Sequence, residues 1–193
     1  MTTRAASAPH RIRIIGGAWK RTPIPVANAA GLRPTPDRVR ETVFNWIAHL
    51  MPDLAAVRGL DLFAGTGALG FELASRGAAR VVLVERAPAL VAALLALKAR
   101  LHAEAIDVVA GDALAVAARL PDASVDLVFL DPPYDAQLLP TLLPLARRLL
   151  ATGGLVYAED RAPIDGALAA AAGLTVVRAS RAGAVFFHLL QAA

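Results

Sequence analysis

The sequence has no cysteine, few aromatic residues and no long apolar run. Zero cysteines among 193 residues excludes a disulfide scaffold, a cysteine nucleophile and a zinc site with thiolate ligands. The four histidines lack the spacing of metal ligands, so we predict no metal site. Proline, arginine, glycine or aspartate interrupts the longest apolar stretches, 138–150 and 163–177, so neither provides the ~20 residues of a membrane span. No apolar segment follows the basic N-terminus, and we therefore expect a soluble cytoplasmic protein.

Charge is distributed unevenly along the chain. Hydrophobic residues make up 56% of the sequence and charged residues 19%, which excludes a mainly disordered chain. Residues 1–46 carry eight basic and two acidic side chains, a net charge of +6, whereas the remaining 147 residues sum to −2. Such a basic segment is typical of a protein that binds a polyanion. On charge alone, a solvated tail that keeps the protein soluble is an equally good interpretation.

The first part of the chain is predicted to form an extension, residues 10–50, in front of the main domain, residues 51–193. Thr35 is the predicted N-cap of a helix in this extension, with Pro36 at the first helical position. The expected parts, in chain order, are a disordered tail at 1–9, a strand at 11–15, a turn at Gly16-Gly17, a return strand at 20–26 and a helix to about Leu50.

From Gly59 onward, apolar strand patterns alternate with helical patterns, which predicts βαβ units and an α/β fold. Only three residues join the last two strands, so these must run antiparallel. This layout is that of a class I S-adenosylmethionine (SAM)-dependent methyltransferase, a Rossmann-like sheet of seven mostly parallel strands with helices on both faces. The predicted strands are 58–63, 80–85, 106–111, 125–131, 154–160, 174–180 and 184–191, and the predicted helices are 67–76, 87–102, 113–119, 136–151 and 163–172.

A glycine-rich segment ends the first strand of this domain and begins a helix. Gly65, Gly67 and Gly70 match the G-x-G-x-x-G pattern, in which glycines allow a tight turn and close approach to a ligand. Glu85 ends the next strand and is placed to accept hydrogen bonds from ribose hydroxyls. Asp61 favours SAM over NAD, because an acid beside a pyrophosphate is unfavourable whereas SAM carries a cationic ammonium. The candidate cofactor-binding residues here are Asp61, Phe63, Ala64, Gly65, Thr66, Gly67, Gly70 and Glu85.

Asp112 and Ala113 follow the third strand. In this fold the Asp112 carboxylate lies near the adenine and is able to accept from its amino group. The alternative is that Asp112 only caps the helix at 113–119. The residue pattern does not separate these two roles.

The most specific signal is Asp131-Pro132-Pro133-Tyr134, directly after an apolar strand. Consecutive prolines stop the strand and fix the backbone. The Asp131 carboxylate and the Pro132 carbonyl are then placed to accept both N–H groups of a nucleobase amine. Tyr134 is placed to stack on a base held out of its own stack. The catalytic candidates are therefore Asp131, Pro132, Pro133 and Tyr134.

Longer segments resemble a known family. The matching segments are 13–20, 31–46, 61–70, 131–134 and 156–159, which span nearly the whole chain. The glycine loop and Asp-Pro-Pro-Tyr occur in many amino-methyltransferases, whereas the segment around Arg33-Pro34-Thr35 and the following helix single out one family. On these segments the chain resembles the RsmD-type 16S rRNA (guanine-N2)-methyltransferases of bacteria.

This resemblance implies transfer of one methyl group from SAM to the exocyclic N2 of guanine 966 in 16S rRNA, with S-adenosylhomocysteine as product and no metal. It implies an rRNA partner within a partly assembled small ribosomal subunit, and we expect a monomer. The helix after Glu85 lacks an asparagine expected from the family. The candidate RNA-binding residues are Arg11, Arg13, Lys20, Arg21, Arg33, Thr35 and Arg38.

Other interpretations stay open on the sequence alone. A DNA adenine-N6 methyltransferase carries the same Asp-Pro-Pro-Tyr, although only 59 residues follow Tyr134, which leaves little room for a target-recognition domain. A non-catalytic RNA-binding protein on this fold would bind SAM without transferring its methyl group. An NAD oxidoreductase is disfavoured by Asp61. Glu159 is either structural or part of the pocket, and Trp19 and Trp46 are expected to be packing residues.

Overall fold

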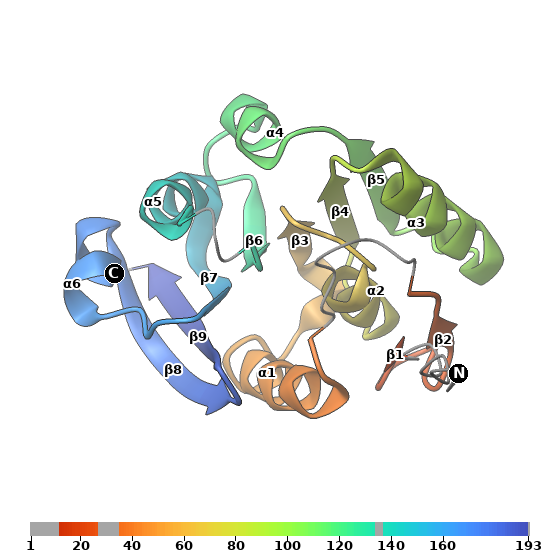
Figure 1. The fold of residues 1–193 in the computed structure, drawn as a ribbon, viewed down its shortest axis with the longest axis horizontal. Coiled ribbons are helices and arrows are strands. Elements are labelled where there is room, and N and C mark those ends of the chain that lie inside the picture. Colours follow the sequence, from red (N-terminus) through yellow and green to blue (C-terminus); the bar gives the residue numbers. More distant parts are fainter. Residues whose placement is uncertain (1–11, 27–34, 134–136, 193) are drawn as a thin grey trace, which may run out of the picture.

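The computed structural model describes residues 12–26, 35–133 and 137–192, and its centre is a seven-stranded sheet (Figure 1). The strand order is β5-β4-β3-β6-β7-β9-β8, and every strand pair is parallel except those that include β9. This confirms the predicted class I methyltransferase fold. The strands are β3 (Arg58–Asp61), β4 (Arg80–Glu85), β5 (Ile106–Ala110), β6 (Val125–Leu130), β7 (Leu150–Asp160), β8 (Leu174–Ala182) and β9 (Val185–Ala192).

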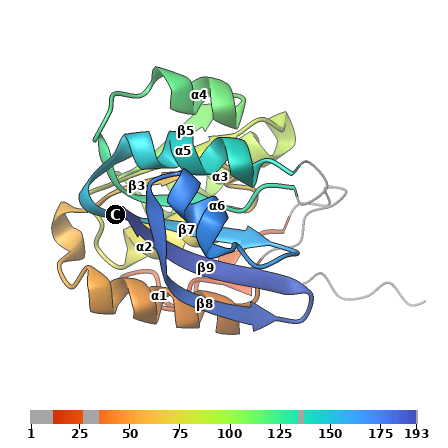
Figure 2. The ribbon, with the colours of Figure 1, turned by 90° about the vertical axis from the view of Figure 1, so that its left-hand side faces the viewer.

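Helices cover both faces of the sheet (Figure 2). Buried residues of α1, α2 and α3 form one core with the sheet, and those of α4, α5 and α6 form a second core on the other face. None of the helices in the described ranges has the length and apolar character needed to cross a bilayer. The helices are α1 (Asp37–Leu50), the 3-10 turn η1 (Leu54–Ala56), α2 (Ala68–Ser75), α3 (Pro88–Leu101), α4 (Ala113–Arg119), α5 (Leu139–Leu149) and α6 (Gly166–Ala171).

The main-domain elements agree with the predicted ranges to within a few residues, because long apolar runs and their periodicity are strong local signals. Two differences occur. The η1 turn was not predicted, and β7 begins at Leu150 rather than 154. The predicted tail at 1–9 lies outside the described residues.

The N-terminal strands are much shorter than predicted. They form a two-stranded antiparallel hairpin of β1 (Ile12–Arg13) and β2 (Pro23–Ile24). The hairpin continues through two more backbone bonds, from Ile14 N to Thr22 O and from Arg21 N to Ile14 O. Nearer the turn, backbone hydrogen bonds go to α2 instead. Ala18 N donates to Ser75 O at 2.7 Å, and Trp19 N donates to Ser75 Oγ at 2.9 Å.

The start of α1 corrects the prediction for Thr35. The helix begins at Asp37, with Pro36 at the N-cap and no side-chain hydrogen bond capping the helix. The Thr35 hydroxyl instead donates to Glu159 Oε1 at 2.8 Å. Water is able to bind the free N–H groups of an exposed helix end, whereas a buried carboxylate has to find its hydrogen-bond donors within the protein. The Thr35 hydroxyl therefore binds Glu159 rather than capping α1.

Candidate active site

The parallel strands bring the predicted acidic residues to one edge of the sheet. Asp61 pairs with Phe129, and Phe129 pairs with Tyr157, so these three side chains lie on the same face. Asp131 and Glu159 each lie two residues further along β6 and β7, and therefore on that face too. The register thus places Asp61, Asp131 and Glu159 together at the carboxyl ends of β3, β6 and β7, on the side that α1 and α2 cover.

The glycine loop packs tightly between this edge and α2. Gly65 and Gly67 have positive φ values of +53° and +79°. A Cβ atom on Gly70 would lie 2.1 Å from Leu83 Cδ2, so only glycine lets α2 approach β4 this closely. The first two glycines therefore form the turn, and the third allows the helix to pack on the sheet.

Both oxygens of Glu85 hold backbone next to the loop. Oε2 accepts from Gly65 N at 2.9 Å, and Oε1 accepts from Ala87 N at 2.8 Å. The carboxylate is thereby fixed beside the glycine turn. Asp112 caps α4, because its Oδ1 accepts from Ala115 N at 3.0 Å. Each carboxylate oxygen has two acceptor positions, so neither role prevents a further contact with a ligand.

Electrostatics at this edge are unusual because acids lie near acids. Asp61 is buried, and burial raises its pKa from 3.8 to about 7, with a further contribution from the charge of Glu85. Backbone hydrogen bonds from Phe63 and Gly70 oppose this rise. Burial also raises the pKa of Asp131 well above its usual range, and the charges of Glu159 and Asp61 add to this effect. Within the described residues, neither Asp61 nor Asp131 forms an ion pair with a basic side chain.

Glu159 is held in place by hydroxyl groups from two elements. Its Oε1 accepts from Thr35 Oγ1 at 2.8 Å and from the Tyr157 hydroxyl at 2.7 Å. All three residues are buried. Thr35 directly precedes α1, so this contact links the N-terminal extension to the site. Sequence reasoning left the role of Glu159 open, and it missed the Tyr157 contact.

Comparison with known proteins shows which family the chain is similar to. A family model described as "Conserved hypothetical protein 95" matches residues 12–191. An Escherichia coli protein named ribosomal RNA small subunit methyltransferase D is 38% identical over 187 residues, which is 96% of this chain and 92% of that protein. A Haemophilus influenzae protein of the same name is 37% identical over 192 residues, with 96% of each chain covered.

The chain belongs to the RsmD-type methyltransferase family. The similarity extends to a solved Escherichia coli methyltransferase structure, which is 35% identical to this RsmD-type chain. The two structures superpose with a TM-score of 0.80, over 94% of this chain and 98% of that one.

A buried ion-pair cluster joins the N-terminal hairpin to the methyltransferase core of this RsmD-type chain. Glu72 of α2 is fully buried and accepts from Ile15 N at 2.6 Å and Gly16 N at 2.8 Å. It also pairs with Arg76 at 2.8 Å and with Arg40 at 3.5 Å. We call Glu72, Arg40 and Arg76 the hairpin clamp. Sequence reasoning missed it and counted Arg40 only as part of the basic charge.

Arg40 is the central cation of the hairpin clamp. Burial lowers its pKa, while Asp37 and Glu72 oppose that effect. Its guanidinium donates to Asp37 Oδ1 at 2.7 Å, and it also binds two backbone oxygens, Arg13 O at 2.7 Å and Thr35 O at 3.2 Å. The signal was present in the sequence. Arg40 lies three, four and seven residues before Val43, Phe44 and Ile47. These spacings place Arg40 on the same buried face of the helix as those apolar residues.

The predicted RNA-binding residues that the structure describes fall into three groups. Arg13 is exposed but pairs with Asp37 at 3.0 Å. Lys20, Arg21 and Arg38 are exposed, and no ion pair within the described ranges includes them. Thr35 is buried against Glu159 and is therefore a residue of the site edge rather than of an exposed surface. Arg11 and Arg33 lie outside the described residues, as does the catalytic candidate Tyr134.

A basic pocket of about 550 Å³ lies between the hairpin and α1. Four of its lining residues are basic, and Glu41 is the only acidic one. The basic residues are Arg13, Lys20, Arg21 and Arg76. The pocket thus brings together positive charges from the hairpin and from the C-terminal end of α2.

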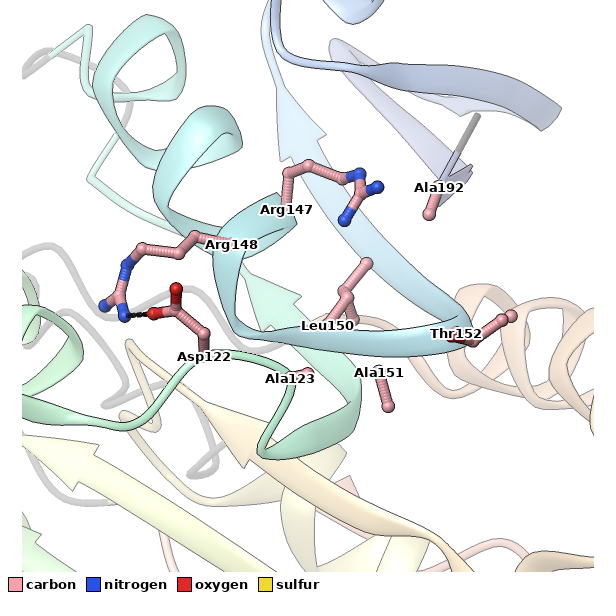
Figure 3. Close-up of a pocket in the computed structure, with 9 residues that line it drawn as sticks. Asp122, Ala123, Arg147, Arg148, Leu150, Ala151, Thr152 and Ala192 are labelled. Carbon is pink, nitrogen blue, oxygen red and sulfur yellow. Dashed lines mark hydrogen bonds and ion pairs between the residues drawn. The ribbon is translucent and has the colours of Figure 1, made fainter.

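A second pocket, shown in Figure 3, lies where α5 ends and β7 begins. It contains none of the predicted site residues. Its arginines have structural partners: Arg148 binds Asp122 and the carbonyls of Ala117 and Leu120, and Arg147 donates to Gly173 O at 3.2 Å. It lies at the amino end of β7, so it is separate from the candidate active site. Within the described residues, no group of three metal-binding side chains is positioned to hold a metal ion.

Proposed function

We propose that this chain transfers a methyl group from SAM to the exocyclic N2 of a guanine in small-subunit rRNA, the guanine numbered 966 in the family. The observation that carries the proposal is Asp131. It follows a buried central strand, precedes two prolines, and lies beside the glycine loop among other acids. The names of the curated relatives support rRNA as the substrate class.

The residues around the glycine loop fit SAM as the cofactor. SAM would lie across the loop, with Glu85 and Asp112 toward the adenosine and Asp61 toward the cationic amino-acid end. The fit rests on charge, because Asp61 is buried beside Glu85 and forms no ion pair within the described residues. A cationic ligand would lower the pKa of Asp61, whereas a pyrophosphate would raise it.

The chemistry needs position and a proton acceptor. When bound, SAM would supply the methyl group and leave as S-adenosylhomocysteine, whose sulfur keeps the electron pair of the broken S–CH₃ bond. Asp131 and the Pro132 carbonyl accept from the amine and orient its lone pair toward the methyl carbon. Formation of the N–CH₃ bond makes the amine acidic, and one of its protons leaves. The raised pKa of Asp131 makes its carboxylate a better acceptor for that proton.

The direct test offers SAM with a labelled methyl group to three substrates. These are small ribosomal subunits lacking the modification, deproteinised rRNA and duplex DNA. We expect label in subunit rRNA, recovered after digestion as N2-methylguanine. Label in DNA adenine would contradict the proposal and identify a DNA adenine methyltransferase. SAM binding with no transfer to any substrate would instead support a non-catalytic RNA-binding protein.

The exposed basic residues of the extension are the proposed contact with RNA phosphates. Replacing Lys20 and Arg38 with alanine should weaken RNA binding and reduce its salt dependence. The slope of log K against log salt should fall by about 0.7–0.9 for each phosphate that the variant no longer neutralises. Arg147→Ala, on α5 at the opposite face of the sheet, is the control and should leave the slope unchanged. An equal change in the control would remove the extension from the interface.

A further inference from the structure

The carboxyl edge of the sheet contains a second acid beside Asp131 that the proposed chemistry does not use. Leu130 and Ala158 are paired in register, so Asp131 and Glu159 follow them as neighbours on adjacent parallel strands. Such strands lie about 4.8 Å apart. Their side chains point to the same face, because both residues are one position beyond the same registered pair. Two acceptors therefore lie side by side at the place where the target base must enter.

The geometry points to Glu159 as a specificity-determining residue that accepts a hydrogen bond from N1–H of the target guanine. This inference rests on the proposed function. The Watson–Crick edge of guanine presents N1–H and the 2-amino group next to each other, so it offers adjacent donors to adjacent carboxylates. Adenine presents an unprotonated N1 beside its amine, and a carboxylate facing that nitrogen is repelled.

Contacts within the protein hold Glu159 as an acceptor. Thr35 and Tyr157 both donate to its Oε1, which holds this oxygen as a hydrogen-bond acceptor. Glu159 is 3% exposed, which removes competing water from the hydrogen bond. The charge of Glu159 acts directly on Asp131, which confirms that the two carboxylates are close.

The test changes the base and the protein together. Small subunits are reconstituted with rRNA in which a ligated synthetic segment carries guanine or 2-aminopurine at the target position. 2-Aminopurine keeps the 2-amino group but has an unprotonated N1. Transfer of labelled methyl is measured as kcat/KM for wild type, Glu159→Gln and Asp160→Asn. Asp160 follows Glu159 on β7 and points to the opposite face, so its variant is the matched control.

We expect wild type and Asp160→Asn to prefer guanine by about 10- to 100-fold, the usual discrimination of one well-placed base contact. The glutamine amide is able to donate to an unprotonated N1, so Glu159→Gln should bring the ratio within about threefold of one. The base change at C6 is common to all three proteins, so the change in ratio isolates the contact to N1. A thermal melt and SAM binding check that Glu159→Gln is folded.

Three results would overturn the inference. A slow Glu159→Gln enzyme that keeps the wild-type preference would show that Glu159 only supports the fold. Loss of the preference in Asp160→Asn as well would show an unspecific effect. If Glu159→Gln fails to fold, Thr35→Val keeps the carboxylate and should lower kcat/KM while preserving the preference; disappearance of the preference would contradict the inference. Absence of methyl transfer to guanine by wild type would instead overturn the proposed function, and the inference with it.

Discussion

Two buried carboxylates near α2 have opposite surroundings. Glu72, in the middle of the helix, accepts from two backbone N–H groups and pairs with Arg40 and Arg76. Asp61, just before the glycine loop, lies near Glu85 and Asp131, and within the described residues no basic side chain pairs with it. Both carboxylates are almost completely buried, with exposed fractions of 0% and 2%.

The comparison contrasts a charge that the fold itself compensates with one that we propose a ligand compensates. Burying a charge is costly unless partners compensate it. The fold itself supplies the partners of Glu72, so that residue holds elements together. Within the described residues no basic side chain pairs with Asp61 or Asp131, and in the proposed function a cationic cofactor and an amine substrate would supply the missing charge and donors. Strongly shifted acids in such a place are typical of active sites.

The largest effect is expected from breaking the hairpin clamp. Arg40→Leu leaves Glu72 buried with less compensation, and the free energy of unfolding should fall by about 3–5 kcal/mol. Urea denaturation followed by circular dichroism measures this change. Arg80→Leu is the control, because Arg80 pairs with Asp107 on the surface with 67% of its side chain exposed. The control should lose less than about 1 kcal/mol. Equal losses in both variants would remove the distinction between the clamp and a surface pair.

Asp131→Ala should have the opposite profile, with a large loss of activity and little loss of stability. Removing the acceptor of the amine should reduce methyl transfer by about 100- to 1,000-fold. SAM affinity should stay within a few-fold, because Asp131 faces the amine rather than the cofactor. Stability should be unchanged or higher, since a desolvated charge is removed. Full activity in this variant would refute the catalytic assignment.

Gly17→Ala tests how tightly the hairpin turn docks on α2, without changing a charge. Gly17 has a φ of +75°, and an added Cβ would lie 1.8 Å from Ser75 O, so the hairpin turn would have to leave α2. Gly183, at φ +61° with open space around it, has the same strain without the clash. Gly17→Ala should therefore cost at least about 2 kcal/mol more than Gly183→Ala in the same denaturation experiment. A similar cost for the two would mean that the turn is not tightly docked.

The sequence predicted most of this fold because its signals are local. Apolar runs located the strands, glycines located the loop, and Asp131-Pro132-Pro133 located the end of β6. Partners in the hairpin clamp could not be predicted, since Arg40 and Glu72 are 32 residues apart and nothing local specifies which buried charge meets which. Thr35 and Glu159, 124 residues apart, show the same limit. Their contact also explains why a helix-cap pattern at Thr35 was misleading.

The raised pKa of Asp61 predicts that both the stability of the protein and its affinity for SAM depend on pH. Its value of about 7 in the folded protein lies above the 3.8 of an ordinary aspartate, so the folded state binds an extra proton between these values. The extra proton stabilises the folded state. This stabilisation by protonated Asp61 is fully present below about pH 4 and is lost as the pH rises through about 7. A bound cation favours the carboxylate, so SAM binding should release this proton. SAM affinity should therefore rise by up to about tenfold per pH unit below pH 7.

Proton release on SAM binding is the most direct test of the claim that the edge acids await an external partner. Calorimetry at about pH 6 in two buffers with different ionisation enthalpies counts the protons exchanged. We predict that wild type releases more protons than Asp61→Asn, with a difference approaching one. Equal proton release by wild type and Asp61→Asn, or net proton uptake by wild type alone, would contradict the account.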